Sequence, residues 1–433
     1  MHPLVAGAYE AAARLAGAAA AVAPAGDAKV LRALRGRRGV VARYRAWGDG
    51  ERDPARPLLW MHAPSVGEGL QARPVLERLR AARPATQLAY TFFSPSAEPF
   101  ARRLDVDFRD YLPFDAAGDV RAALDALRPS ALVFSKLDVW PRLVATAADR
   151  DVPLGLISAT LARGAGRGRP GGALLLRDAY AALDAIGAID AEDAERLVAL
   201  GARPSAIRVT GDTRYDQVWV RAQGADRAGV LLAPLRSGRP TLVAGSTWPP
   251  DEERLLAAWT LVRRRVPDAR LVLAPHEPTP AHLAPFTRWA GESRLALARL
   301  ANASPTIDVI LVDRVGVLGD LYALADAAYV GGGFHAAGLH SVLEPAAYGV
   351  PVLFGPRHGH SRDARLLMAA GGGATATTPA ALADRLASWL GDARAREAAG
   401  RAARAVVVGG LGAADRSLGL VLELLDGHAQ AGR

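Results

Sequence analysis

The sequence contains no cysteine, which excludes disulfide frameworks, thiolate metal sites and cysteine nucleophiles. Lysine is scarce as well: of 53 lysines and arginines only Lys29 and Lys136 are lysines, which indicates GC-rich coding more than chemical selection. Near the N-terminus, the charge-free stretch 15–26 is too short and too rich in Ala and Gly for a spanning helix, which needs about 20 strongly apolar residues. No basic region precedes it, so the sequence does not predict a secretory signal peptide.

The 433 residues are enough for two or three domains of about 100–200 residues each, and the 50% share of hydrophobic residues excludes disorder as the bulk state. The net charge of +9 is concentrated, because residues 1–50 carry eight basic residues against three acidic ones. Such a segment favours anionic surfaces. We expect residues 1–45 to form a basic helical segment next to a membrane; the alternative is an Ala-rich helix packed on the protein. Nucleic-acid binding is not predicted, because the basic cluster has few interleaved aromatic residues and no recognised module.

Short apolar runs alternate with amphipathic helical stretches from residue 57 to 220, a pattern typical of a parallel sheet with helices on both faces. The helices expected in this half include Gly69–Ala82 and Ala116–Leu127. The expected strands are Leu58–His62, Gln87–Phe92, Asp110–Leu112, Ala131–Phe134, Leu154–Ser158, Ala185–Ala188 and Ile207–Val209.

The same pattern restarts after a polar interval, rich in Gly and Pro, at roughly 217–239. The expected strands are Thr241–Ala244, Arg270–Leu273, Val309–Leu311, Ala327–Val330 and Val352–Phe354. The expected helices are Glu252–Arg264, Leu318–Leu324, Leu343–Ala347, Asp363–Ala369, Pro379–Leu390 and a closing helix, Arg416–Leu425. The sequence therefore predicts an α/β protein with two doubly wound domains, at 46–220 and 240–410, which face each other across a cleft, followed by the closing segment 411–433.

One carboxylate stands where the first expected strand passes into a helix. The apolar run 58–61 predicts a buried strand, and residues 64–67 read as a turn, so Glu68 falls at the N-terminus of the following helix. In α/β folds this is the side of the sheet where ligands bind. A carboxylate there can accept a proton from a substrate hydroxyl. It would also complement the helix dipole without any chemical role, and this alternative stays open.

Three loops at expected strand ends of the second half carry polar residues. The first holds the hydroxyls of Ser246 and Thr247 before a helix N-terminus, a favourable place for a phosphate, and the second holds His276. The third contains the glycines 331–333, which would let the backbone approach a ligand closely. Neither a GxGxxG nor a GxxxxGK[ST] phosphate loop occurs, and the histidines have no metal-ligand spacing, so no metal site is predicted.

Two readings of the residues after the third loop remain open. Ser341 and Glu344 have the spacing of a capping box, which would give them a purely structural role. Alternatively, Glu344 accepts hydrogen bonds from a ribose diol while the glycines hold a phosphate.

A set of short segments, taken in their order along the chain, resembles the motifs of a known protein family. They are Trp60–Glu68, Tyr90-Thr91, Leu112–Asp115, Asp138–Pro141, Gly211–Asp216, Ala244–Glu253, Gly319–Gly332, Leu343–Ala346 and Gly349–Pro356. All nine resemble, in the same order, segments of one protein family. The five most distinctive family motifs are W-x-H-A-x-S-V-G-E, E-L-W-P, G-N-x-K-F-D, A-G-S-T-x-x-x-E-E and L-E-P-A, which correspond to Trp60–Glu68, Asp138–Pro141, Gly211–Asp216, Ala244–Glu253 and Leu343–Ala346. The chain resembles the 3-deoxy-D-manno-octulosonic acid (Kdo) transferases of lipopolysaccharide assembly over roughly residues 30–400. The resemblance implies the glycosyltransferase fold called GT-B, in which two Rossmann-like domains face each other across a cleft.

The resemblance also implies an inverting transfer of Kdo from CMP-Kdo to a lipid A precursor, without a metal or another cofactor. Glu68 would be the general base, and Asp138 and Thr91 would lie on the acceptor side. The residues that would bind the donor are Arg214, Ser246, Thr247, His276, Gly332, His340, Ser341 and Glu344. The enzyme would act at the cytoplasmic face of the bacterial inner membrane, peripherally or weakly anchored, with residues 1–45 toward the anionic surface.

The chain departs from the family's pattern at several of these positions. Ser341 replaces an asparagine, Leu339 replaces a glycine, and Lys136-Leu137 replaces the Glu-Thr that precedes E-L-W-P. Two alternatives therefore stay open. One is a GT-B enzyme with another nucleotide-sugar donor, such as a UDP-sugar transferase or epimerase. The other is a degenerate GT-B domain that serves as a membrane-associated binding module.

Overall fold

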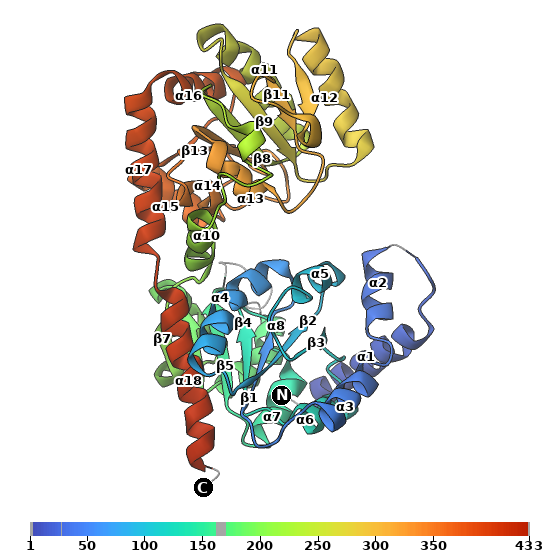
Figure 1. The fold of residues 1–433 in the computed structure, drawn as a ribbon. Coiled ribbons are helices and arrows are strands. Elements are labelled where there is room, and N and C mark those ends of the chain that lie inside the picture. The colour runs from blue at the N-terminus through green and yellow to red at the C-terminus, as the bar shows by residue number, and fades with distance from the viewer. Residues whose placement is uncertain (1–2, 27, 162–169, 432–433) are drawn as a thin grey trace. The chain divides into compact units, whose positions relative to one another are not determined.

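The computed structural model describes residues 3–26, 28–161 and 170–431, and the chain divides into two compact units. Unit 1 comprises residues 1–217 and 411–433, and unit 2 comprises residues 218–410. Each unit contains one seven-stranded parallel sheet with helices packed around it (Figure 1). The prediction of two doubly wound α/β domains is confirmed. The segments expected at 1–45 and 411–433 cluster with unit 1 instead of forming separate parts.

The sheet of unit 1 has the strand order β3-β2-β1-β4-β5-β6-β7. Its order reverses between β1 and β4, the two central strands, whose pairing sets Leu59 beside Ala131 and His62 beside Phe134. The strands are β1 (Leu58–His62), β2 (Gln87–Phe92), β3 (Phe108–Tyr111), β4 (Ala131–Ser135), β5 (Leu154–Ala159), β6 (Ala185–Ala188) and β7 (Ile207–Val209).

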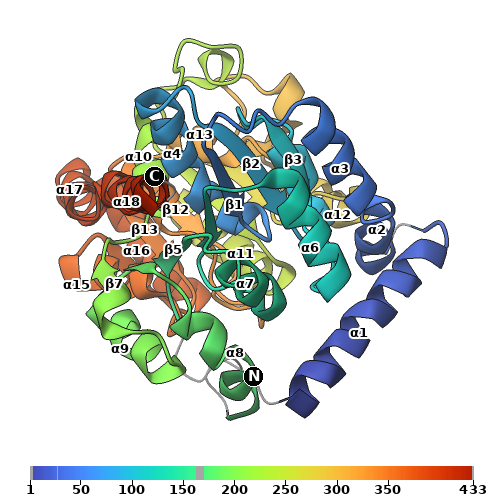
Figure 2. The same cartoon turned by 90° about the horizontal axis from the view of Figure 1, so that it is seen from below.

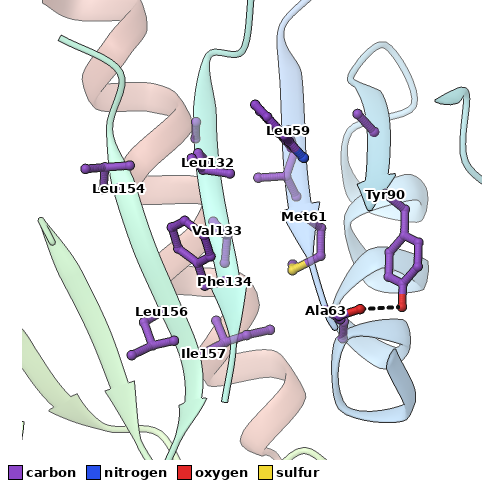
Figure 3. Packing of buried hydrophobic residues seen from close by; sticks show 14 of the residues in the cluster. Leu59, Met61, Ala63, Tyr90, Leu132, Val133, Phe134, Leu154, Leu156 and Ile157 are labelled. Atoms are coloured by element: carbon purple, nitrogen blue, oxygen red, sulfur yellow. Dashed lines mark hydrogen bonds between the residues drawn. The ribbon is translucent and has the colours of Figure 1, made fainter. Parts of the chain in front are cut away.

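The core of unit 1 lies between this sheet and its helices. Figure 3 shows side chains of β1, β4 and β5 in this core, with the Tyr90 hydroxyl donating to the carbonyl of Ala63 at 3.5 Å. The last helix of the chain closes it, because a Cβ added to Gly155 would lie 2.7 Å from a methyl of Leu424. The helices are α1 (Pro3–Val22), α2 (Lys29–Gly36), α3 (Val40–Gly50), α4 (Val66–Ala82), η1 (Pro95–Ala97), α5 (Glu98–Ala101), α6 (Ala117–Leu127), α7 (Pro141–Ala148), α8 (Pro170–Ala181), α9 (Ala191–Leu200), η3 (Pro204–Ala206), α10 (Arg214–Gln223), which continues into unit 2, and α18 (Ala413–Ala431).

The sheet of unit 2 has the order β10-β11-β9-β8-β12-β13-β14 and reverses between β8 and β12. The strands are β8 (Thr241–Thr247), β9 (Arg270–Pro275), β10 (Leu297–Arg299), β11 (Val309–Leu311), β12 (Ala327–Val330), β13 (Val352–Phe354) and β14 (Gly373–Thr375). The helices are η4 (Ala233–Leu235), α11 (Pro249–Arg265), α12 (Pro280–Glu292), η5 (Leu300–Asn302), α13 (Leu318–Leu321), η6 (Tyr322–Leu324), α14 (Leu343–Ala347), α15 (Arg362–Ala370), α16 (Pro379–Gly391) and α17 (Ala393–Gly409).

The strands missed by the sequence pattern are the two edges of the second sheet, β10 and β14, and the helices α12 and α17 of the second half were missed as well. Both strands have only three residues, which are half-buried or exposed, so neither has an apolar run. Another difference concerns α4, which begins at Val66 within the expected turn. Ser65 is its N-cap, and the Ser65 hydroxyl accepts a hydrogen bond from the amide of Gly67 at 3.2 Å.

Helix α1 is fastened to unit 1, where it runs beside α2 (Figure 2). The Tyr9 hydroxyl donates to Asp115 at 2.7 Å, and the Glu10 carboxylate accepts from the amide of Ala117 at 3.0 Å, at the N-terminus of α6. The helix thus packs on the protein, which is the alternative that the sequence analysis left open. It still exposes apolar side chains, since Leu15 and Val22 are 71% and 79% exposed.

Within the described part of the chain, one stretch is long and apolar enough to cross a membrane, Ala393–Gly427, which spans α17 and α18. About a third of its most apolar window is buried inside the protein. Val407 of α17 is fully buried in unit 2, and Val421 of α18 belongs to the core of unit 1. Core helices of soluble proteins have the same composition, so this stretch is only weak evidence for a membrane span.

Candidate active site

In doubly wound sheets, ligands bind at the carboxyl ends of the strands where the strand order reverses. In unit 1 this switch point lies between β1 and β4. Glu68 follows β1 in the first turn of α4, and Lys136 and Asp138 follow β4. The two loops are 68 residues apart in the chain, yet the order of the strands brings them side by side.

Glu68 is held by groups from both loops. Its side chain is 15% exposed, and its Oε1 lies 3.0 Å from Lys136 Nζ. The Ser65 hydroxyl donates to the other carboxylate oxygen, and the Ser135 hydroxyl donates to the Glu68 carbonyl at 3.1 Å. Lys136 adopts a left-handed conformation, with φ of 71°, directly after the strand. The Glu68 carboxylate is therefore fixed in orientation while part of it stays open to solvent.

The electrostatics keep Glu68 ionised. Burial by itself would raise the pKa of this carboxyl, but the Lys136 ammonium and the hydrogen bonds from Ser65 and Lys136 outweigh burial, so the pKa lies below its ordinary value. A carboxylate that is charged at neutral pH, partly exposed and rigidly held can take a proton from a hydroxyl placed against it.

A buried hydrogen-bonded chain reaches Asp138 from inside the sheet. Trp60 Nε1 donates to the Thr91 hydroxyl at 2.9 Å, which lies 3.0 Å from His62 Nδ1. His62 Nε2 lies 3.4 Å from Asp138, and Trp140 Nε1 donates to the same carboxylate oxygen at 3.0 Å. Asp138 is thus oriented from two sides at the carboxyl edge of the sheet.

These hydrogen bonds correct the prediction for Thr91 and add His62 to the candidate site. Thr91 has no exposed surface, so it does not face an acceptor directly as expected; its hydroxyl is used inside the protein. His62, which sequence reasoning gave no role, connects Thr91 to Asp138. The signal was present, because His62 is the histidine of the segment Trp60–Glu68.

Arg214 lies in unit 1 at the start of α10, apart from the other residues expected to bind the donor, which all lie in unit 2. Its guanidinium contacts Asp212 Oδ2 at 2.6 and 2.8 Å. Burial raises the pKa of Asp212, but the Arg214 charge and hydrogen bonds, with that from Gln71, lower it overall. Gln71 belongs to α4, so Arg214 is tied through Asp212 to the helix that carries Glu68.

At the switch point of unit 2 four aromatic rings gather. Trp248 follows β8, His276 follows β9, and His335 and His340 follow β12. The Trp248 ring stacks on His335 with centroids 4.2 Å apart and on His276 at 4.5 Å, and His276 lies 4.5 Å from His340. Trp248 Nε1 donates to His340 Nε2 at 2.9 Å.

The imidazole of His340 is neutral at physiological pH. Burial, with the neighbouring His276, lowers its pKa to about 4. An uncharged Nε2 is also what accepting the Trp248 N–H requires. Among the described residues no group of three or more His, Cys, Asp or Glu side chains has an arrangement that would hold a metal ion. The predicted donor residues His276 and His340 thus belong to one stacked cluster.

The glycines after β12 have a different purpose from the one expected. A Cβ on Gly331 would lie 2.2 Å from the carbonyl of Ser246, and one on Gly332 would lie 2.1 Å from the carbonyl of Gly338. These two glycines therefore allow the loops to approach each other closely. The Gly332 amide is also engaged, because it donates to buried Asp251 at 2.8 Å.

Asp251 is the organising residue of this edge. Besides Gly332, its carboxylate accepts hydrogen bonds from the amides of Trp248 and Phe334, at 3.1 Å each, and from the Tyr329 hydroxyl at 3.0 Å. One buried carboxylate thus binds the loops after β8 and β12 together at the switch point.

The two hydroxyls after β8 differ in availability. Thr247 is fully buried and donates to Glu252 at 2.8 Å, and Glu252 also contacts His282 at 2.9 Å, so Thr247 is not placed to meet a ligand. Ser246 is half-buried and has a left-handed backbone with φ of 52°. Of the pair, Ser246 is the residue whose side chain remains open.

The capping box expected at Ser341 and Glu344 is absent from this described part of the chain, because the N-cap of α14 is Val342 and no side chain caps it. Ser341 is exposed, and Glu344 is half-buried. Burial raises the pKa of Glu344, while the charge of Arg221 opposes the rise. The capping-box reading of this pair is therefore wrong, and ligand binding by Glu344 stays a prediction.

The sequence and the fold are similar to those of known proteins. A family model described as 3-deoxy-D-manno-octulosonic-acid transferase (kdotransferase) matches residues 33–217. The chain is 32% identical to the 3-deoxy-D-manno-octulosonic acid transferase of Bordetella pertussis, over 85% of this chain and 88% of that protein. It is 25% identical to the protein of the same name from Haemophilus influenzae, over 92% and 93% of the two chains. The UDP-GlcNAc 2-epimerase from Neisseria meningitidis, solved with UDP-GlcNAc, superposes on 85% of this chain and 100% of its own at a TM-score of 0.63 and 13% identity, a likeness of fold alone.

Proposed function

Because this chain belongs to the 3-deoxy-D-manno-octulosonic acid (Kdo) transferase family, we propose that it transfers Kdo from CMP-Kdo to a lipid A precursor in lipopolysaccharide assembly. The chain matches its relatives over most of their length, which supports an enzyme of the same class. The observation in the structure that carries the proposal is the ionised Glu68 carboxylate, held by Lys136 and Ser65 at the switch point of unit 1.

In the proposed reaction Glu68 accepts the proton of the acceptor hydroxyl as the hydroxyl oxygen attacks the anomeric carbon of Kdo. A carbon–oxygen bond forms on one face of that carbon, and the bond to the phosphate of CMP breaks on the other, so the configuration inverts. CMP leaves with the electron pair of the broken bond. The leaving group is a monophosphate, so neutralising it requires less positive charge than a diphosphate, and we expect no divalent metal to be required.

Unit 2 would bind the donor. Ser246, His276 and Ser341 keep exposed or half-exposed polar groups at the carboxyl edge of its sheet, suited to a phosphate and a sugar acid. Glu344 would accept hydrogen bonds from the ribose diol. Asp138, oriented by His62 and Trp140, would contact the acceptor.

We also propose that the enzyme works peripherally at the cytoplasmic face of the inner membrane. The support is the net positive charge of residues 1–50 and the exposed apolar side chains Leu15, Val22 and Val30 on the first two helices. Such a combination of basic and apolar groups favours an anionic lipid surface.

The proposal is tested by thermal unfolding with CMP, CDP, UDP, GDP or ADP, each with and without magnesium. A nucleotide at 100 times its dissociation constant stabilises the folded state by about 2.7 kcal/mol. We expect stabilisation by CMP without magnesium, followed by transfer from CMP-Kdo to a lipid IVA-type acceptor. Preference for a diphosphate, or no stabilisation by any nucleotide, would contradict the proposed donor.

A further inference from the structure

A hollow of about 550 Å³ opens on unit 1, away from the residues assigned above. It lies between helix α2, the short helices η1 and α5, and the end of β3. The residues that line it are Arg32, Arg35, Gly36, Pro95, Glu98, Pro99, Arg102 and Tyr111.

Helix α2 is fixed over this hollow by a buried arginine next to it. The Arg37 guanidinium donates to the carbonyls of Leu112 and Phe93, at 3.0 Å each, and lies 3.8 Å from the centre of the Phe93 ring. Burial lowers the pKa of Arg37 to about 10, so it remains charged at neutral pH. The anchored helix presents Arg32 and Arg35 to the hollow in a preformed arrangement.

The lining carries more positive than negative charge. Its one carboxylate, Glu98, accepts hydrogen bonds from Arg102 at 2.6 Å and from the Tyr111 hydroxyl at 3.2 Å. Arg32 forms no ion pair with another described residue. One Nη of Arg35 donates to the carbonyl of Gly26 at 2.6 Å, while its Nε has no hydrogen-bond partner among the described residues. Within the part of the chain that the structure describes, the guanidinium groups of Arg32 and Arg35 therefore have no counter-charge.

The hollow lies close to Glu68 within the same unit. The Ser94 amide, just before η1, donates to the carbonyl of Pro64 at 2.8 Å, and Pro64 lies in the loop that leads to Glu68. A Cβ on Gly69 would lie 2.5 Å from the Phe100 ring, so α5 packs against the first turn of α4. The hollow and the candidate base therefore share the carboxyl edge of one sheet.

We propose that this hollow binds a phosphate group of the acceptor lipid while a hydroxyl of the same lipid reaches Glu68. The inference rests on the proposed function, since it names the acceptor feature that unit 1 recognises. A phosphate monoester carries nearly two negative charges at neutral pH, which complements Arg32 and Arg35. Guanidinium groups bind phosphate oxygens in pairs, with strong charge-assisted hydrogen bonds. Phospholipid headgroups offer the same chemistry, so the test separates the two sources.

The test compares Arg32→Gln with the wild type. The Arg32 side chain is exposed, so the change does not threaten folding. Arg103→Gln is the matched control, because Arg103 is an exposed neighbour of Arg102 that does not line the hollow. Binding of a phosphorylated lipid IVA-type acceptor in detergent micelles is measured directly, and transfer kinetics follow with that acceptor and with its phosphatase-treated form.

We expect Arg32→Gln to weaken acceptor binding and raise KM about tenfold with little change in kcat, as loss of a charge-assisted hydrogen bond predicts. Arg103→Gln should match the wild type, and the phosphatase-treated acceptor should bind all variants equally. Unchanged binding in Arg32→Gln would overturn the proposal. An equal loss with both acceptors would also overturn it, and weaker binding to phosphatidylglycerol vesicles would then assign the hollow to headgroups. Wild-type protein that binds the acceptor but transfers no Kdo would contradict the proposed function and leave the phosphate site supported.

Discussion

The switch points of the two units have the same topology and opposite chemistry. In unit 1, where β1 and β4 end, an ionised carboxylate lies against an ammonium group, Glu68 with Lys136 at 3.0 Å. In unit 2, where β8 and β12 end, the rings of Trp248, His276, His335 and His340 stack, and His340 stays neutral. One fold thus supports a fixed carboxylate–ammonium pair at one switch point and a stack of aromatic rings at the other, since the loops and not the sheet decide the chemistry.

The largest effect is expected when the charge of the Glu68 carboxylate in unit 1 is removed. Glu68→Gln keeps the shape of the side chain but cannot accept a proton, so kcat should fall by a factor of about 10² to 10⁴. The measurement is the rate of Kdo transfer at saturating donor and acceptor.

Its control is Glu77→Gln on the same helix, where Glu77 forms an exposed pair with Arg73 at 3.3 Å. That variant should retain wild-type turnover, because exposed ion pairs contribute little. If Glu68→Gln turned over like the wild type while its fold was intact, Glu68 would not be the base, and its role would be limited to the helix dipole.

Unit 2 depends on a carboxylate as well, although a structural one. Asp251→Ala would leave the amides of Gly332, Trp248 and Phe334 and the Tyr329 hydroxyl without their acceptor, so we expect a loss of about 3 kcal/mol in the free energy of unfolding. Denaturant titration measures it. Asp384→Ala, which removes an exposed partner of Arg265, should change stability by less than about 0.5 kcal/mol. Equal effects of the two variants would show that the Asp251 network is not what holds the edge.

A smaller effect is expected on the pH dependence of the reaction, which is set by Glu68 in unit 1. The Lys136 ammonium lowers the pKa of Glu68, so Lys136→Met should raise it, and the carboxylate would become protonated at a higher pH than in the wild type. The acid limb of kcat/KM should therefore move to higher pH, with a loss on the order of tenfold at pH 5 and a smaller one at pH 8. Lys136→Arg retains the charge and should restore most of the profile. A uniform loss across the pH range would mean that Lys136 only supports the fold.

The sequence could predict Glu68 but not its partner. The strand and helix patterns place Glu68 at a strand end, and a recognisable motif surrounds it. Lys136 was visible only as a departure from the family's pattern and as one of two lysines. Its contact with Glu68 depends on the adjacency of β1 and β4 and on the left-handed backbone at Lys136, and local periodicity reports neither.

In unit 2 the same limit produced errors. Glycines after β12 and hydroxyls after β8 are typical of phosphate loops, so a ligand was expected near Gly332 and Thr247. The structure gives those groups to Asp251 and Glu252, which come from the following helix α11. A pattern can show that a polar or small residue ends a strand, but whether protein or ligand satisfies it is decided by packing between loops far apart in sequence.

The smallest expected effect tests whether the His340 imidazole is neutral. His340 has a pKa of about 4 in the folded chain and about 6.5 when unfolded, so between these values the unfolded chain binds a proton that the folded chain does not. Stability should therefore fall as the pH is lowered from 7 to 5, with His340 contributing on the order of 1 kcal/mol. His340→Gln can still accept the Trp248 N–H but does not titrate, so its urea midpoint should depend less on pH than that of the wild type. His360→Gln, a change at an exposed loop histidine, should keep the wild-type dependence. If His340→Gln kept it too, the imidazole would not be neutral by virtue of burial, and the contrast between the two switch points would rest on shape and not on charge.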